Sequence, residues 1–233
     1  MAAPDSSRTR LAVVGGTGPH GRGLGTRFAA AGLAVSIGSR DPERAAAAAD
    51  EVTELAGRLA DDSGTGAVKV ESGVNADVVA AADIVVVAVP WSGHAETLRE
   101  LAPLLADKVV VDCVNPLGFD ERGPYPVVVA EGSAAQQAQR QLPGSRVVAA
   151  FHHVSAVLLL DPDVRGIDTD VLVLGDDRAA ADQVIALAGT VPGMRGVFAG
   201  RLRNAGQVEA LAANLIAINR RYKTHAGIRV TLA

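Results

Sequence analysis

Short apolar runs alternate with longer amphipathic stretches along most of the chain. The clearest runs, at residues 11–14, 84–89 and 108–114, are rich in Val, Ile, Leu and Ala. Runs of this length and composition are typical of strands buried on both faces of a parallel sheet. Stretches with helical spacing follow them, so that strands and helices alternate. This alternation predicts an α/β fold with helices on both faces of a parallel sheet.

The rest of the pattern extends this series and then changes near residue 151. Further strands are expected at residues 34–37, 68–71 and 146–151, and helices at 22–31, 43–59, 73–82, 95–105 and 133–142. Residues 61–66 and 118–126, which contain glycine, are expected to form loops. After residue 151 we expect a loop at 161–170, a strand at 171–174, a helix at 177–188, a strand at 193–199, a helix at 202–222 and a closing strand at 228–232.

Three glycines follow the first strand in the spacing Gly16-x-Gly18-x-x-Gly21. The first permits a tight turn, the second lets the backbone approach a pyrophosphate, and the third lets the next helix pack closely on the strand. The unpaired amides and the dipole of that helix favour an anion at its N-terminus. Because a strand precedes the glycines and a helix follows, the motif predicts a Rossmann-type dinucleotide site. We expect a doubly wound Rossmann-type domain at residues 1–151 and a small C-terminal α/β domain at 152–233.

The end of the second strand indicates which dinucleotide binds. NAD-binding chains carry an acidic residue there, about 20 residues beyond the glycines, which binds the ribose 2′-hydroxyl. Here Ser39 and Arg40 occupy that place, and Arg44 follows one turn into the next helix. Arginine and serine suit a 2′-phosphate, so the sequence favours NADP(H). Asp41 is adjacent, but Asp41-Pro42-Glu43 is typical of a helix start; the alternative for Arg40 is an ordinary surface arginine.

Composition narrows the class of protein. The chain has 233 residues, of which 48% are hydrophobic, and a net charge of −4, which gives no indication of binding to nucleic acid. Its single cysteine, Cys113, excludes a disulfide framework and fits a reducing cytoplasm. The first ten residues lack the apolar segment of a secretion signal, and no apolar run reaches the roughly 20 residues of a membrane span. We expect a cytoplasmic protein that binds small molecules.

Side chains at the carboxyl ends of the strands are expected to line the site, because ligands of open parallel sheets bind there. Trp91, the only tryptophan, either forms a flat wall against a nicotinamide or packs in the core. His94 is expected to make a hydrogen bond near a helix end. His152 and His153 are neighbours on an expected strand, so they would point to opposite faces and would not share a metal. We therefore expect no metal site.

No motif marks a general acid. A carbonyl or imine reductase needs a proton donor near the hydride acceptor. The residues able to serve are His20, His94, His152, His153, His225, Tyr125, Tyr222 and Lys223. The chain after residue 151 is short for a helical substrate domain and suits a flat partner better. If that partner is a redox cofactor, hydride passes directly between two stacked rings, and no side chain is catalytic.

Five segments together resemble the NADPH-dependent coenzyme F420 reductases, also called deazaflavin-dependent NADP oxidoreductases. They are GGTGPHGRGLGTRFAAAG, IGSRDPERA, AADIVVVAVPW, AAFHHVSA and AGIRV, and the resemblance runs from about residue 11 to about residue 232. It implies reversible hydride transfer between C4 of the nicotinamide of NADP and C5 of the deazaflavin. It also implies a Rossmann domain with a small C-terminal domain, and a homo-oligomer, usually a dimer.

The resemblance also implies roles for individual residues. The pyrophosphate would be held by Thr17, Gly18, Pro19 and His20, and the 2′-phosphate by Ser39, Arg40 and Arg44. The nicotinamide pocket would be lined by Trp91, Leu117 and Ala156. His152 and Val154 would touch the deazaflavin.

The C-terminal helix carries basic residues in a chain that is acidic overall, namely Arg203, Arg220, Arg221 and Lys223. These would suit the phosphate and the polyglutamate tail of the deazaflavin coenzyme, or they form a solvated helix face. Two other functions stay open at this point. One is an NADPH-dependent reductase of imines, flavins or ferric chelates, and the other is a binding protein that senses the redox state of NADP.

Overall fold

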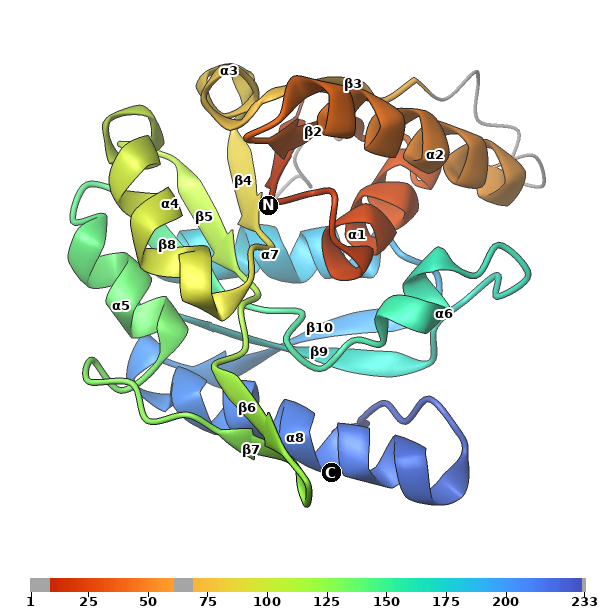
Figure 1. The fold of residues 1–233 in the computed structure, drawn as a ribbon, viewed down its shortest axis with the longest axis vertical. Coiled ribbons are helices and arrows are strands. Elements are labelled where there is room, and N and C mark those ends of the chain that lie inside the picture. The colour runs from red at the N-terminus through yellow and green to blue at the C-terminus, as the bar shows by residue number, and fades with distance from the viewer. Residues whose placement is uncertain (1–8, 61–68, 232–233) are drawn as a thin grey trace.

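The computed structural model describes residues 9–60 and 69–231; the expected loop at 61–66 lies outside this range. One eight-stranded sheet forms the middle of the molecule (Figure 1). Its strands have the order β10 (Met194–Gly200), β9 (Thr169–Gly175), β8 (Arg146–Ala149), β5 (Val109–Asp112), β4 (Ile84–Val87), β1 (Arg10–Val14), β2 (Ala34–Ser39) and β3 (Glu71–Val74). All neighbours run parallel except β8 and β9. The order from β3 to β8 is that of a Rossmann fold, which confirms the predicted fold class.

Helices cover both faces of the sheet. One face packs against α1 (Pro19–Ala30), α2 (Pro42–Ala60), α6 (Ala156–Leu160) and α7 (Arg178–Gly189). The other packs against α3 (Asn75–Ala81), α4 (Trp91–Leu105), α5 (Ala134–Gln141) and α8 (Ala205–Tyr222), which follows a short 3-10 turn at Leu202–Asn204.

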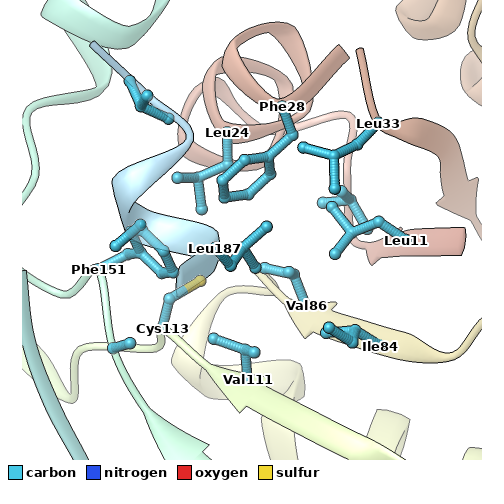
Figure 2. Packing of buried hydrophobic residues seen from close by; sticks show 14 of the residues in the cluster. Leu11, Leu24, Phe28, Leu33, Ile84, Val86, Val111, Cys113, Phe151 and Leu187 are labelled. Atoms are coloured by element: carbon cyan, nitrogen blue, oxygen red, sulfur yellow. The ribbon is translucent and has the colours of Figure 1, made fainter. Parts of the chain in front are cut away.

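Alternate residues of each strand supply the two halves of the core. Leu11 and Val13 belong to the cluster beneath α1, whereas Ala12 and Val14 belong to the cluster beneath α3 and α4. This is the period-two pattern of a strand buried on both faces. Figure 2 shows the first cluster, in which Leu24, Phe28 and Leu187 meet the strand residues Leu11, Val86 and Val111. The continuous apolar runs in the sequence reflect this burial on both sides.

Helices α1 and α4 begin several residues earlier than the sequence predicted, and a proline lies at the start of each. Helix α1 begins at Pro19, not at residue 22, and α4 begins at Trp91 directly after Pro90. Pro19, at the first position of α1, loses nothing by lacking an N–H, because that amide has no partner within the helix. Pro90 is the N-cap residue of α4. Strand β3 also lies later than expected, since Glu71 pairs with Ser36 of β2.

The loop prediction for residues 118–126 was wrong. These residues form most of an antiparallel hairpin, β6 (Leu117–Asp120) and β7 (Gly123–Pro126), which lies against α8 in Figure 1. The carboxylate of Asp120 accepts hydrogen bonds from the backbone N–H groups of Arg122 and Gly123, and Gly123 has a φ of 118°. A two-residue turn therefore joins strands whose glycine and proline content suggested a loop.

After residue 151 the chain adds to the same sheet. Strand β8 ends at Ala149, and β9 and β10 then extend the sheet beyond it. The predicted division into residues 1–151 and 152–233 thus lies between β8 and β9, the two strands that pair antiparallel. As a domain boundary, this division stays a prediction. The predicted closing strand at 228–232 is wrong for residues 228–231, which have no strand structure; residue 232 lies outside the described range.

Candidate active site

The turn after β1 leaves no room for a side chain at Gly15, Gly16 or Gly21. A Cβ atom on Gly16 would lie 2.9 Å from the carbonyl oxygen of Val13, and one on Gly21 would lie 2.9 Å from Cα of Gly16. Gly15, which the motif does not include, has a φ of 70°, and a Cβ there would lie 2.6 Å from Val89. The tight turn predicted for Gly16 and the close packing predicted for Gly21 are present, and Gly15 is a third constraint.

The N-terminus of α1 is uncapped by any side chain. Gly18 is the N-cap residue, and the first helical hydrogen bond runs from the amide of Arg22 to the carbonyl oxygen of Gly18 at 2.9 Å. Pro19 has no amide to satisfy. The free amides and the helix dipole favour an anion at this end of the helix.

The tip of β2 carries two arginines beside a helix cap. Arg40 and Arg44 are exposed and have no ion-pair partner among residues 9–60 and 69–231. The carboxylate of Asp41 accepts hydrogen bonds from the amides of Glu43 at 3.0 Å and Arg44 at 3.3 Å. Asp41 therefore caps α2, as the sequence predicted, and leaves both guanidinium groups available for a ligand.

A first cavity, cavity A, joins the glycine turn to the tip of β2. Its volume is about 750 Å³. Its lining includes seven predicted site residues, Thr17, Gly18, Pro19, His20, Ser39, Arg40 and Arg44. It also includes residues that sequence reasoning missed, among them Gly15, Asn75 and Thr97. Asn75 begins α3, and its Oδ1 is buried without a hydrogen-bond partner, so it offers a further polar contact here.

A second cavity, cavity B, lies at the carboxyl ends of β4, β5 and β8. Its volume is about 410 Å³. Its lining includes five predicted residues, His20, Trp91, His152, Val154 and Ala156, together with Asn115, Leu215, Asn219 and Ala226. His20, Ala88, Val89 and Pro90 line both cavities, so the two adjoin.

Three histidines gather at cavity B. His152 and His153 are buried, with 3% and 4% of their surface exposed. Both line cavity B, as does His20. Burial is the main cause that lowers the pKa of each of the three to about 4, so the imidazoles are neutral at pH 7. Both ring nitrogens of His152 and Nε2 of His20 are buried without a partner. The cavity therefore presents neutral groups that can donate or accept hydrogen bonds.

The prediction that His152 and His153 lie on a strand was wrong. The strand ends at Ala149, and Phe151 turns the chain with a φ of 63°, a conformation that costs energy for a non-glycine residue. The Phe151 ring packs edge-to-face on Phe28, with centroids 5.7 Å apart. Nδ2 of Asn115 donates to the carbonyl oxygen of His152 at 2.7 Å. These contacts hold the turn that brings both imidazoles to the cavity.

A buried arginine fixes the other side of cavity B. Nε of Arg27 in α1 donates to the carbonyl oxygen of Leu159 at 2.8 Å, and its Nη atoms donate to those of Asp161 and Val164. These bonds hold α6, and hence Ala156 at its start, against α1. A Cβ on Gly23 would lie 2.5 Å from Cβ of Leu159, so this glycine is needed for the approach. The sequence pattern gave no signal for this contact.

Three predicted site residues do not line either cavity. Gly16 and Gly21 lie behind the turn, where they act through packing. Leu117 is half-buried at the start of β6, and its contact with a nicotinamide stays a prediction. The described ranges contain no group of three or more His, Cys, Asp or Glu side chains arranged to hold a metal ion. Within those ranges no helix is both long and apolar enough to span a membrane.

Several known proteins are similar to this chain in sequence and in fold. A model of the family described as NADP oxidoreductase, coenzyme F420-dependent, matches residues 10–116. The F420-dependent NADP reductase of Methanothermobacter thermautotrophicus is 41% identical over 227 residues, which cover 95% of this chain and 94% of that protein. This chain belongs to the F420-dependent NADP reductase family.

A second relative and a solved structure match most of this chain. The F420-dependent NADP reductase of Methanothermobacter marburgensis is 38% identical over 228 residues, which cover 95% of this chain and 98% of that protein. A crystal structure of a protein described as a possible F420-dependent NADP reductase, from Arthrobacter sp. FB24, superimposes with a TM-score of 0.79 at 28% identity. It covers 96% of this chain and 100% of the other.

Proposed function

We propose that this chain catalyses reversible hydride transfer between NADP(H) and the deazaflavin coenzyme F420. The observation that carries the proposal is the pair of adjoining cavities. Within the described residues, one has an uncapped helix N-terminus and two arginines without an ion-pair partner, and the other has neutral imidazoles with ring nitrogens that lack a partner. Membership of the F420-dependent NADP reductase family supports the same pairing of substrates.

Cavity A would hold NADP. The pyrophosphate would lie at the free amides of α1, where Gly18 has no Cβ to block it; a Cβ there would meet only the carbonyl oxygen of Gly15, at 3.7 Å. The 2′-phosphate would bind the guanidinium groups of Arg40 and Arg44 through charge-assisted hydrogen bonds. Ser39, 8% exposed, adds a hydroxyl beside them. The nicotinamide would then reach the wall that both cavities share.

Cavity B would hold the deazaflavin ring. Four polar atoms of its lining are buried and lack partners in the described ranges, namely Nε2 of His20, both ring nitrogens of His152 and Oδ1 of Asn115. A buried polar atom without a partner costs free energy, so a heterocycle with donors and acceptors at its edge suits this lining. Trp91 and Val154 offer apolar surface to its faces. The exposed basic residues near the end of α8 would meet the acidic tail.

The proposed reaction requires that the nicotinamide ring and the deazaflavin ring be held face to face. A hydride, one proton with two electrons, leaves C4 of the dihydronicotinamide and bonds to C5 of the deazaflavin. The nicotinamide is oxidised to the cation, the deazaflavin is reduced, and a proton from water neutralises the charge that it gains. The protein's residues bind both ligands and hold neutral groups at cavity B. No side chain has to accept or donate the transferred hydrogen.

A spectroscopic assay tests the proposal. Purified protein with NADPH should bleach the absorbance of oxidised F420, and NADH should do so far more slowly. Binding of NADPH without any change in F420 absorbance at any pH would contradict the proposal. Turnover of an imine, a flavin or a ferric chelate in the absence of F420 would instead support a reductase of another acceptor.

The oligomeric state forms part of the same proposal. We propose a homodimer in the cytoplasm, in line with the single buried thiol of Cys113 and with several large apolar side chains exposed on the hairpin and α8. These are Phe119, Tyr125, Ile218 and Tyr222. Light scattering after gel filtration should give twice the mass of one chain, and a single-chain mass at micromolar concentration would contradict it.

A further inference from the structure

A series of hydrogen-bonded polar side chains is buried next to Trp91, outside both cavities. His94 follows Trp91 by three residues in α4, so the two side chains project from the same side of the helix. The His94 side chain is fully buried and lines neither cavity. Its ring centroid lies 5.5 Å from that of Trp91, with the planes tilted by 34°. Trp91 in turn lines cavity B.

The first partner of His94 is a buried carboxylate. Nε2 of His94 lies 2.6 Å from Oδ2 of Asp112, the last residue of β5, which is also fully buried. The other oxygen, Oδ1, accepts a hydrogen bond from the amide of Val114 at 3.0 Å. A buried charge of this kind requires a partner of opposite charge or several hydrogen bonds.

The second partner fixes the protonation of the ring. Nδ1 of His94 lies 3.1 Å from Oε1 of Gln137 in α5. The orientation of that amide is set because its Nε2 donates to the carboxylate of Glu131 at 3.3 Å, and a carboxylate only accepts. Both ring nitrogens of His94 therefore face acceptor oxygens. A neutral imidazole has only one N–H, so two donors require the imidazolium.

We propose that His94 is held as a buried imidazolium by Asp112 and Gln137, and that this fixed cation positions Trp91 as a wall of cavity B. His94 is a positioning residue, since it acts through Trp91 and not on a ligand. A cation beside an indole ring is attracted by the π electrons of that ring. The charge and the ring together restrict the orientation of the flat surface that a planar ligand meets.

The surrounding charges are consistent with this state. Burial alone lowers the pKa of His94, but Asp112, Gln137 and Glu209 outweigh it and raise the pKa above its ordinary value. Glu209 of α8 is buried and accepts hydrogen bonds from the amides of Ala134 and Ala135 at 2.9 and 3.1 Å. The groups around His94 thus come from β5, α5 and α8 as well as from its own helix.

Nitrogen-15 spectra of the histidine side chains test the protonation directly. The chain has five histidines. At pH 8 the wild-type protein should show one imidazole with both nitrogens protonated. His94→Gln should remove that signal and assign it, whereas His225→Gln, at an exposed position, should not. A wild-type spectrum without a doubly protonated ring at pH 8 overturns the proposal, whatever the behaviour of any variant.

Tryptophan fluorescence gives a second readout, because Trp91 is the only tryptophan and an imidazolium quenches indole emission. Wild-type emission should stay constant between pH 6 and 8, although a free histidine titrates near pH 6.5 in this range. Asp112→Asn should introduce a rise in emission with pH, and His94→Gln should be brighter and independent of pH. A wild-type titration centred near pH 6.5 would overturn the proposal.

The consequence for catalysis rests on the proposed function, whereas the two spectroscopic tests need no substrate. His94→Gln should raise the KM for F420 severalfold and leave the Kd for NADPH within twofold of wild type, with circular dichroism confirming the fold. Equal changes in the KM for F420 and in the Kd for NADPH would show that His94 has a general structural role, and would overturn its role in positioning Trp91. If the wild-type protein did not reduce F420, the proposed function would be wrong. The two spectroscopic tests would still decide whether His94 is an imidazolium beside Trp91.

Discussion

At the scale of single residues, Arg40 and Arg44 are the groups expected to distinguish NADP from NAD. Both are exposed at the rim of cavity A and have no carboxylate partner in the described ranges. The neighbouring carboxylate of Asp41 is occupied by the amides of α2. A 2′-phosphate would therefore meet two positive charges without a competing negative charge.

Arg40→Glu should weaken NADPH binding by about 10- to 100-fold, because a charge-assisted hydrogen bond of about 1.5–3 kcal/mol is lost and a repulsion is added. The Kd for NADH should change little. Titration calorimetry with both nucleotides measures the difference. Arg99→Glu, at an exposed position of α4 that lines neither cavity, is the control for the change in charge. Comparable losses for NADPH and NADH would refute the assignment of the 2′-phosphate.

His152 gives a direct test of cavity B at the scale of one residue. Its ring nitrogens have no partner in the described structure, so a ligand at this cavity is the group expected to use them. His152→Ala should lower kcat/KM for F420 roughly threefold to tenfold, the cost of one neutral hydrogen bond and some packing. The Kd for NADPH should stay nearly constant, as it should for the exposed control His225→Ala. If NADPH binding falls in parallel, the residue is structural.

At the scale of elements, a buried carboxylate makes several of the contacts that hold the segment after α8. Asp170 of β9 accepts two hydrogen bonds from Arg195, one from Arg229 and one from the amide of Val230, at 2.6–2.9 Å. These contacts, with hydrogen bonds from Arg195 chiefly responsible, lower the pKa of Asp170. They hold the segment that includes Ala226, which lines cavity B and whose amide donates to Asn219 at 2.6 Å.

Asp170→Asn should loosen this segment, because a neutral amide cannot balance two guanidinium groups. We expect the KM for F420 to rise, the Kd for NADPH to stay unchanged, and the Tm to fall by a few degrees, since 1 kcal/mol corresponds to roughly 2–4 °C at this size. Asp168→Asn, which alters an exposed partner of Arg229, should have a smaller effect on each quantity. A larger effect from Asp168→Asn would argue against the buried carboxylate as the anchor.

At the scale of the whole molecule, the buried histidines affect stability at acid pH. The folded state lowers the pKa of His152 and His153 to about 4, below the value of about 6.5 expected in the unfolded chain. Between these values the unfolded state binds more protons, so stability falls as pH decreases from about 6.5 toward 4. Glu209 acts in the opposite direction, because burial raises its pKa to about 7, so its stabilising effect is lost as pH rises from about 4.5 to 7.

Comparison of variants separates these contributions. His152→Gln should lose less free energy of unfolding than wild type between pH 7 and pH 5, by about 1–2 kcal/mol, since each pKa unit corresponds to 1.36 kcal/mol. Urea unfolding at several pH values measures this difference, and the exposed control His225→Gln should follow the wild-type curve. Parallel curves for His152→Gln and wild type would show that His152 titrates normally in the folded state.

For the molecule as a whole, the sequence predicted some features of the fold and of the candidate site and not others. Buried strands, the glycine turn and the tip of β2 were predictable because their signals are local, in apolar runs and in turn residues. The turn at Phe151, the contacts of Arg27 and the pairing of His94 with Asp112 were not. Each depends on residues that are distant in the chain or on a conformation that only surrounding contacts impose.

The wall shared by the two cavities has a kinetic consequence. His20, Ala88, Val89 and Pro90 line both, so a bound nicotinamide would complete the surface against which the deazaflavin stacks. Steady-state turnover should therefore follow a compulsory order, in which NADP(H) arrives first and leaves last. Product inhibition should then be competitive only between NADPH and NADP⁺.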